Sequence, residues 1–310
     1  MGHQTAATEP HRGSALFMDT LVALQIVTDA PKGEVSASME RAFGWFAEIE
    51  RICSRFETES EVMHLTRQIG TPVPVSKTLF TLIAFAIEVS RLSGGAFDPT
   101  VGALLEQRGF NRNYRTGERV ATAIAPTHRP SYRDVELDPA RRTVTLHAPL
   151  ILDLGAVAKG LAIDLAAREL AVFGNYTVDA GGDLYVKGWN AAGEPWSVGI
   201  RHPRRDGELI ARLHLSDAAV CTSGDYERAH TTGAGGHHLL DPGTGHAFTA
   251  VASVTVVAPA AMVADALSTA AFILGPTEGR AFLERQGVEG LIISPALEQC
   301  ATSDFARYLQ

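Results

Sequence analysis

Two oxygen-bearing side chains share one face of an otherwise apolar segment near the C-terminus. Residues 262–275 read MVADALSTAAFILG, and Asp265 and Thr269 are four positions apart, which puts them on the same side of a helix. One interpretation is structural: Asp265 caps the helix and the Thr269 hydroxyl donates to a carbonyl one turn earlier. The other is functional, because a carboxylate and a hydroxyl at this spacing present two hard oxygens to one Mg²⁺ or Ca²⁺ ion. The segment alone favours the structural interpretation, since polar residues are common near helix starts.

Two earlier segments place acids and a lysine at turns before expected helices. In FDPTVGAL, Asp98 precedes Pro99, so we expect Asp98 to be the N-cap of a helix whose first residue is Pro99. In LDLGAVAKG, a strand delivers Asp153, and glycines bracket Lys159 where a helix begins. Free N–H groups at a helix start and a nearby ammonium both favour phosphate, although the spacing of a P-loop is absent. In each segment a plain capped turn is an equally good interpretation.

The best candidate for a general base is His238 in the segment HHLLDPGTG. A neutral imidazole near pH 7 suits proton abstraction from a hydroxyl. The chain has 11 histidines, so this residue alone favours a structural role. The run AGGD (180–183) is interpreted as a tight hairpin turn, because it lacks the GxGxxG pattern of a phosphate loop. No GxSxG and no HExxH occur, so a serine hydrolase or a zinc protease has no specific support.

Hydrophobic periodicity predicts the elements that position these residues in the N-terminal half. Partial alternation predicts one strand over 15–28, and apolar residues at helical spacing predict helices over 34–53 and 77–93. The glycine-marked GGAFDPTVGALLEQRGF predicts a loop that opens a short helix. Residues 111–131 are polar, contain proline and show no periodicity, so they are interpreted as a surface excursion.

The C-terminal half mixes short strands with two long helices. Strands are predicted near 133–137 and 142–147, followed by a turn and the helix that carries Lys159. TVDAGGDLYVKG predicts two strands joined through Gly-Gly, and WSVGIRHP, LIARLHLS and AAVCTSG predict consecutive antiparallel strands. SVTVVAP predicts a buried strand before the helix of residues 262–275, and residues 291–294 a last core strand. Without a regular βαβ rhythm or a clear linker, the chain is predicted to be α+β, with a disordered tail at 1–14 and a single domain at 15–310.

Composition excludes several classes of protein. The 310 residues carry a net charge of −8, and the most basic run, RHPRRD (201–206), is interpreted as a solvated turn, which argues against a nucleic-acid binder. Three isolated cysteines argue against a disulfide framework or a zinc site. The polar N-terminus has no apolar signal region and no lipid-anchoring cysteine, and no apolar run is long enough to span a bilayer. A cytoplasmic location is therefore the expectation.

Eight segments, taken in order, resemble the ApbE family. They are FMDT, SRFETESEV, GGAFDPTVGAL, LDLGAVAKGLAID, DAGGDLYVKG, VCTSGDYER, HHLLDPGTG and SVTVVAPAAMVADALSTAAFILG, and they extend from about residue 15 to about residue 295. The family comprises the FAD:protein FMN transferases, formerly labelled thiamine-biosynthesis lipoproteins. The resemblance implies one interwoven α/β unit with mixed and antiparallel sheets and flanking helices.

The resemblance also implies an activity and its cofactors. Such proteins bind FAD and Mg²⁺ and move the FMN moiety of FAD onto a Thr or Ser hydroxyl of an acceptor protein, releasing AMP. Some members instead hydrolyse FAD to FMN and AMP, so an FAD pyrophosphatase is the alternative enzyme. A non-catalytic FAD-binding carrier is the alternative from another class. Oxygen ligands suit Mn²⁺ as well as Mg²⁺.

By the same resemblance, the metal ligands are Asp265, Thr269 and the backbone carbonyl of Ala156. His238 is the expected general base for the acceptor hydroxyl. The residues expected to line the FAD site are Met18, Phe56, Ala96, Phe97, Asp98, Asp153 and Lys159.

The chain departs from the family pattern in three places. Asp19 stands where the family has a glycine after the methionine, and Phe56 stands where the family often has tyrosine. The leader and lipid-anchoring cysteine of exported members are not found at the N-terminus. Outward-facing membrane redox complexes are therefore expected to be poor acceptors.

Overall fold

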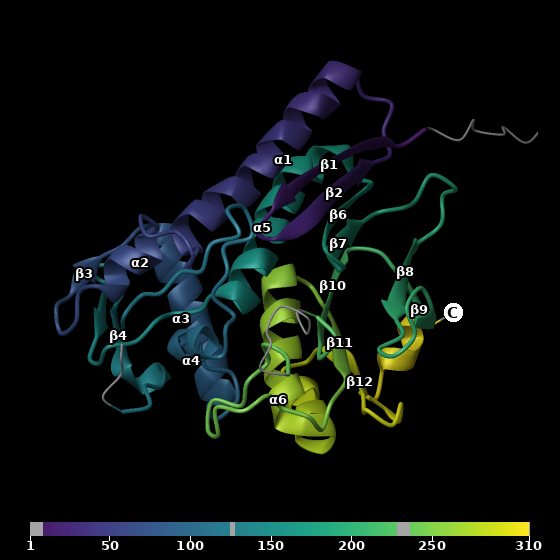
Figure 1. Ribbon diagram of the computed structural model, residues 1–310. Coiled ribbons are helices and arrows are strands. Elements are labelled where there is room, and N and C mark those ends of the chain that lie inside the picture. The colour runs from purple at the N-terminus through teal and green to yellow at the C-terminus, as the bar shows by residue number, and fades with distance from the viewer. Residues whose placement is uncertain (1–8, 125–127, 228–235, 310) are drawn as a thin grey trace, which may run out of the picture.

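An eight-stranded antiparallel sheet forms the centre of the protein (Figure 1). The computed structural model describes residues 9–124, 128–227 and 236–309. Every pairing within this sheet is antiparallel. In spatial order the strands are β1 (His11–Phe17), β2 (Thr20–Ile26), β6 (Tyr176–Ala180), β7 (Asp183–Lys187), β10 (Ala218–Gly224), β11 (Ser253–Ala258), β12 (Glu289–Ile293) and β13 (Gln299–Ala301).

Three long helices cover one face of this sheet, and a two-stranded sheet covers part of the other (Figure 1). The division follows the alternation of side chains along a strand. In β10, Ala219 and Cys221 pack into the core beneath the helices, whereas Val220 packs into a second core beneath the small sheet. The helices are α1 (Lys32–Cys53), α5 (Gly155–Leu170) and α6 (Ala261–Arg285), and the small sheet is β8 (Trp196–Arg201) with β9 (Leu209–Leu215).

The remaining elements form a separate layer beyond α1 and α5 (Figure 1). A three-stranded sheet in the order β3, β5, β4 lies there beside three shorter helices. The strands are β3 (Val73–Pro74), β4 (Val135–Asp138) and β5 (Thr143–Leu146), and the helices are α2 (Glu61–Thr66), α3 (Lys77–Leu92) and α4 (Gly102–Gln107). Three short 3₁₀ turns occur at Tyr132–Asp134, Ala171–Phe173 and Phe305–Tyr308.

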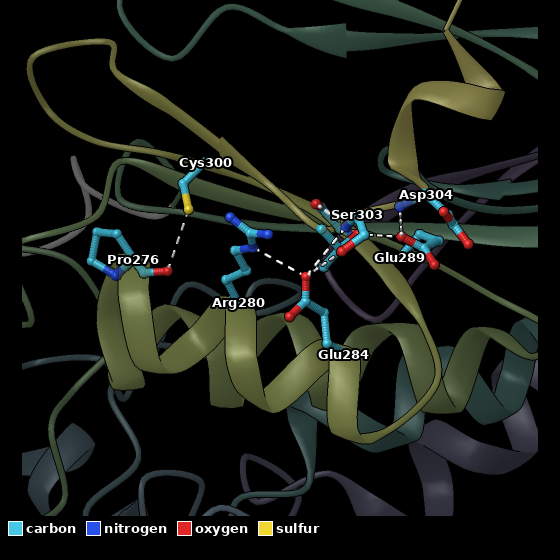
Figure 2. A network of polar contacts seen from close by, with 9 residues as sticks. Pro276, Arg280, Glu284, Glu289, Cys300, Ser303 and Asp304 are labelled. Carbon is cyan, nitrogen blue, oxygen red and sulfur yellow. Dashed lines mark hydrogen bonds and ion pairs between the residues drawn. The ribbon is translucent and has the colours of Figure 1, made fainter.

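Polar contacts attach the C-terminal half of α6 to the end of the sheet. The Glu284 carboxylate accepts from Arg280 Nε at 3.1 Å and from Ser303 Oγ at 3.0 Å, as Figure 2 shows. The Glu289 carboxylate accepts the backbone N–H of Asp304 at 3.2 Å. Each surface contact stabilises the fold only slightly. The Glu284–Ser303 contact joins the sheet end to the half of α6 that follows the break at Gly275, and Asp265 lies in the half before it.

The predicted α+β class is confirmed, as are the helices predicted at 34–53 and 77–93. The single strand predicted at 15–28 is wrong, because β1 and β2 are two strands joined by a turn at Met18 and Asp19. That turn contains one residue type that marks turns, Asp19, but no glycine, proline or asparagine, so its signal in the sequence is weak.

Two further sequence interpretations need correction. Residues 11–14, placed in the disordered tail, belong to β1 and pair with β2, while residues 1–8 lie outside the described residues. The three consecutive strands predicted after Trp196 divide between two sheets, since β9 pairs with β8 but β10 joins β7 and β11. That residues 15–310 make one domain stays a prediction. Within the part of the chain that the structure describes, no helix is long and apolar enough to cross a membrane.

Candidate functional site

A cavity of ≈ 270 Å³ lies where the β1–β2 turn, the start of α5, the end of β10 and the first half of α6 meet. Segments from distant parts of the chain contribute to its wall. All eleven residues proposed from the sequence line it: Met18, Phe56, Ala96, Phe97, Asp98, Asp153, Ala156, Lys159, His238, Asp265 and Thr269. The fold therefore brings the whole predicted set to one place.

Asp265 does not cap its helix, so the structural interpretation of this residue is wrong. The helix α6 begins at Ala261, and Asp265 lies in its second turn. The side chain is only 6% exposed, and its Oδ2 atom has no hydrogen-bond partner within the described structure. An unpaired buried carboxylate oxygen is costly, so its presence at a cavity wall points to a ligand.

The hydroxyl of Thr269 also differs from the structural interpretation. Its Oγ1 lies 3.1 Å from Ser223 Oγ on β10. The expected bond back to the helix is made instead by the preceding residue, because Ser268 Oγ donates to the Asp265 carbonyl at 2.9 Å. Asp265 and Thr269 thus both line the cavity, one turn apart on the same helix.

A second helix supplies the cap of α6 and packs very closely against it. The Asp164 carboxylate on α5 accepts the backbone N–H groups of Ala261 at 2.7 Å and Met262 at 3.0 Å, so α6 needs no cap of its own. A Cβ atom at Gly160 would lie 2.5 Å from Met262 Cα, closer than real contacts allow. The glycine permits the approach that brings the first turns of α5 next to Asp265.

Burial makes the ionised form of Asp265 unfavourable in the absence of a cation. Burial raises the pKa of Asp265 to about 7. The Lys159 ammonium opposes this shift, whereas the carboxylates of Asp183 and Glu227 add to it, and the N–H of Gly160 opposes it weakly. A divalent cation at Oδ2 would favour the ionised form and relieve this cost.

Lys159 is not a lone surface cation. Its ammonium forms an ion pair with Asp183, which is 3% exposed. Burial disfavours the charged lysine, but the carboxylates of Asp183, Asp265 and Glu227 outweigh burial and raise the pKa of Lys159. The turn predicted at AGGD is confirmed, since Ala180 pairs with Asp183 across it. Sequence analysis missed Asp183, although an acid directly after Gly-Gly could have been noticed.

Arg55 is a second residue that sequence analysis missed. Its Nε donates to Asp153 Oδ2 at 2.7 Å, and its guanidinium lies 4.2 Å from the ring centroid of Phe56. The other oxygen, Asp153 Oδ1, accepts the N–H of Gly155 at 2.9 Å and holds the turn before α5. Arg55 itself is buried. The arginine therefore joins the predicted Asp153 and Phe56 into one wall of the cavity.

The helix predicted to begin at Pro99 begins instead at Gly102. The preceding residues form a turn, because Asp98 Oδ1 accepts the N–H of Thr100 at 2.9 Å. Val101 forms a β-bridge with Ile151, whose carbonyl accepts the N–H of Gly102 at 3.1 Å, so the helix starts only after this bridge. Asp98 Oδ2 accepts a backbone N–H from Tyr132, and burial raises the pKa of Asp98. This acid shapes the wall made by its neighbours Ala96 and Phe97.

Two adjacent histidines have different environments. His237 is buried: Nδ1 accepts the N–H of Leu239 at 3.2 Å and Nε2 lies 2.9 Å from the Phe248 carbonyl, so the Nε2–H tautomer satisfies both. Burial lowers its pKa. His238 lines the cavity, with Nδ1 3.3 Å from the Glu227 carbonyl. To donate to this carbonyl, His238 must carry its proton on Nδ1. In that tautomer Nε2 has the free lone pair that a general base needs.

The turn between β1 and β2 is strained. Met18 has φ 50° and Asp19 has φ 62°, a region that few non-glycine residues adopt. Both residues line the cavity. The two-residue hairpin thus places side chains, rather than glycine, at the edge of the site.

The surface excursion predicted at 111–131 contributes to the cavity through its first residues, Arg112, Asn113 and Tyr114. The Asn113 amide donates to Glu57 at 3.0 Å, and the Tyr114 hydroxyl donates to Glu50 at 2.8 Å. These bonds fold the segment over the end of α1. Only tertiary contacts distinguish these residues from a solvated loop.

No group of three or more His, Cys, Asp or Glu side chains is arranged to hold a metal ion in residues 9–124, 128–227 and 236–309. A cation next to Asp265 would therefore depend on hydroxyl, carbonyl, water or substrate oxygens for its other ligands. Such a mixture is normal for Mg²⁺, which keeps several waters and takes substrate phosphates.

Comparison with known sequences relates this chain to one family. Residues 18–292 match the ApbE family. The chain is 35% identical over 313 residues to the FAD:protein FMN transferase of Treponema pallidum (strain Nichols), covering 94% of this chain and 86% of that protein. It is 30% identical over 282 residues to the FAD:protein FMN transferase of Haemophilus influenzae, covering 84% of this chain and 80% of that protein.

Solved structures give the same relationship. An ApbE protein from Thermotoga maritima superposes with a TM-score of 0.86 at 30% identity, over 97% of this chain and 100% of that one. The flavin transferase ApbE from Vibrio cholerae superposes with a TM-score of 0.82 at 26% identity, over 97% of this chain and 99% of that one.

Proposed function

This chain belongs to the ApbE family, and we propose on that premise that it is a Mg²⁺-dependent FAD:protein FMN transferase. The proposed reaction moves the FMN moiety of FAD onto a Thr or Ser hydroxyl of an acceptor protein and releases AMP. The observation that carries the proposal is the unpaired Oδ2 of Asp265, buried in a cavity wall that also contains Lys159 and His238.

The residues at the cavity fit a Mg²⁺ ion. Asp265 offers an unpaired carboxylate oxygen, and Thr269 offers a hydroxyl one helical turn away. The carbonyl of Ala156, in the first turn of α5, is the third protein ligand in this proposal. When bound, Mg²⁺ would neutralise charge on the diphosphate of FAD.

The other predicted residues suit an extended dinucleotide with a negative centre. Lys159 supplies an ammonium for the diphosphate, and the start of α5 adds the positive end of the helix dipole. Arg55 orients Asp153 and stacks on Phe56, which leaves the carboxylate and the ring as parts of one wall. The remaining wall residues are Met18, Ala96, Phe97 and Asp98.

His238 is the proposed general base. In the transfer, its imidazole takes the proton of the acceptor hydroxyl, and the hydroxyl oxygen forms a bond to the phosphorus of the FMN phosphate. The bond from that phosphorus to the bridging oxygen breaks, and AMP leaves with this oxygen and the electron pair. Because a phosphoryl-type transfer depends mainly on positioning and charge stabilisation, few catalytic groups are needed.

Hydrolysis of FAD would use the same cavity with water in place of the acceptor hydroxyl. The test is to incubate the protein with FAD and Mg²⁺, with and without an acceptor domain that carries a target Thr. AMP release and the intact mass of the acceptor are followed together. AMP with an FMN-sized mass gain supports the transferase, and AMP with free FMN and no gain supports the pyrophosphatase. Bound FAD without AMP in either mixture would contradict both and favour a carrier.

A further inference from the structure

Asp183 is a buried acid that the proposed transfer does not use. Its exposure of 3% is lower than the 6% of Asp265. It does not line the cavity, but two of its partners, Lys159 and Thr222, do. Any influence of Asp183 on the reaction must therefore pass through those partners.

The backbone fixes Asp183 at the first position of β7. It follows the turn at Gly181 and Gly182, whose φ angles are 68° and 96°. A Cβ atom at Gly181 would lie 2.0 Å from Thr20 Oγ1, so the turn packs directly on the β1–β2 hairpin. Because the close contact with Thr20 leaves no room for a side chain at Gly181, the turn and the acid that follows it have little freedom to move.

The carboxylate of Asp183 links α5 to β10. One oxygen pairs with the Lys159 ammonium, and Oδ1 accepts the N–H of Thr222 at 2.8 Å. The backbone pairing of β7 with β10 ends at Leu184 and Val220. The Asp183 side chain joins the two strands one step further, where backbone pairing has stopped. The next residue of β10, Ser223, lies 3.1 Å from the Thr269 hydroxyl.

A lysine at the start of a helix has four rotatable side-chain bonds and three N–H donors. Asp183 occupies one donor of Lys159 and restricts the rest of the side chain, which is 24% exposed. The other donors are then available to a ligand in the cavity that the lysine lines. Asp265 and Glu227, which also interact with this ammonium, lie in the same wall.

We propose that Asp183 is a positioning residue for the transfer: it holds the Lys159 ammonium in the cavity wall beside Asp265, where its remaining N–H donors meet the FAD diphosphate. This inference rests on the proposed function. Asp183 touches neither substrate nor reacting atoms, and it acts through Lys159.

The variant Asp183→Asn separates positioning from a general structural role. The amide keeps the size of the side chain and an oxygen for the Thr222 N–H, but it removes the charge that holds Lys159. We expect kcat to fall by about tenfold to a hundredfold, because small misplacements of a positioning group have effects of this size. The affinity for FAD should not fall, since a negative charge has been removed near an anionic ligand. A general loss of structure would instead lower both kcat and the affinity for FAD.

The experiment compares wild type, Asp183→Asn, Lys159→Met and the double variant. AMP release and acceptor mass give kcat and KM for FAD, and flavin fluorescence titration in EDTA gives the Kd for FAD without metal. If Asp183 acts through Lys159, the Asp183→Asn change has less than a twofold further effect in the Lys159→Met background. Asp179→Asn is the matched control, because this partly buried acid accepts from Gly182 in the same turn and lies outside the cavity wall; its kcat should stay within about twofold.

Several outcomes would overturn the inference. One is an Asp183→Asn variant whose kcat equals that of wild type. Another is an Asp183→Asn change that lowers kcat by the same factor in the wild-type and the Lys159→Met backgrounds. If Asp183→Asn does not fold, the double variant, which removes both charges, must fold and match the turnover of Lys159→Met; a lower value contradicts the proposal. A wild type that releases no AMP from FAD would overturn the proposed function, and this inference with it.

Discussion

Replacing Asp265 by asparagine should make the metal-free protein more stable. The carboxylate is 6% exposed, one of its oxygens has no partner in the described structure, and two other acids lie nearby. Asparagine has nearly the same shape and no charge. The variant therefore removes a buried charge that the Lys159 ammonium compensates only in part, and it creates no cavity.

The size of the effect follows from the raised pKa of Asp265. Its pKa moves from an ordinary value of 3.8 to about 7, and each pH unit corresponds to about 1.4 kcal/mol, so ionised Asp265 costs up to about 4 kcal/mol at pH 8. The amide NH₂ group that replaces Oδ2 lacks a hydrogen-bond acceptor, and this unpaired donor reduces the gain in stability by about 1–3 kcal/mol. The net gain is on the order of 2 kcal/mol, or roughly 4 °C in Tm.

The sign of the pH dependence provides a second check. Because the folded protein holds the Asp265 proton more tightly than the unfolded chain, its stability falls as the pH rises from about 4 through about 7. The Asp265→Asn variant lacks this contribution. The difference in Tm between the variant and wild type should therefore grow between pH 5 and pH 8.

The assay is thermal unfolding followed by circular dichroism, first in EDTA and then with Mg²⁺ and FAD. Wild type should gain about 2.7 kcal/mol when Mg²⁺ is present at a hundred times its Kd, whereas Asp265→Asn should gain little, so the order of stability reverses. Asp206→Asn, at a side chain that is 95% exposed, is the control and should move Tm by less than about 1 °C. A lower Tm for Asp265→Asn in EDTA at pH 8 would refute the reasoning, because the carboxylate would then have a stabilising partner.

Four further predictions concern the same region. His238→Ala should keep FAD affinity but slow FMN transfer by about a hundredfold or more, measured by acceptor mass; unimpaired transfer would remove His238 from the mechanism. Gly160→Ala should lower the free energy of unfolding by about 3 kcal/mol in urea, because its Cβ would meet Met262 Cα at 2.5 Å; a smaller loss than 1 kcal/mol would contradict close packing. Asp19→Gly should raise the free energy of unfolding by about 1 kcal/mol in urea by relieving its positive φ, and a loss would contradict strain at this turn. Because burial lowers the pKa of His237, wild-type stability should fall as the pH decreases below about 6.5, and His237→Asn should flatten that part of a Tm profile.

Much of the fold could be predicted from local patterns. Apolar spacing predicted α1 and α3 within two residues of their ends, and Gly-Gly between alternating runs predicted the β6–β7 hairpin. Local signals failed at Met18 and Asp19, because a single aspartate is a weak turn signal and a methionine rarely adopts a positive φ. They failed again after Trp196, because adjacency along the chain does not determine which sheet a strand joins.

The candidate site was predicted through its motifs rather than through local chemistry. Taken alone, Asp265 read as a helix cap, and His238 could not be separated from His237 by its type. The structure distinguishes the histidines by burial, since one satisfies two backbone groups in the core and the other lines the cavity.

By itself, the sequence predicted the α+β class, the helices α1 and α3 and the β6–β7 hairpin, and its family resemblance supplied the eleven residues that line one cavity. Only the tertiary structure decided that Asp265 lacks a partner, that Asp164 caps α6 from another helix, and that Asp183 and Arg55 support the site. The physical reason is that periodicity and turn chemistry are local properties of the chain. Burial, charge pairing and close helix approach depend on residues that are about 100 positions apart in sequence, as Arg55 and Asp153 are, and exist only once the fold has formed.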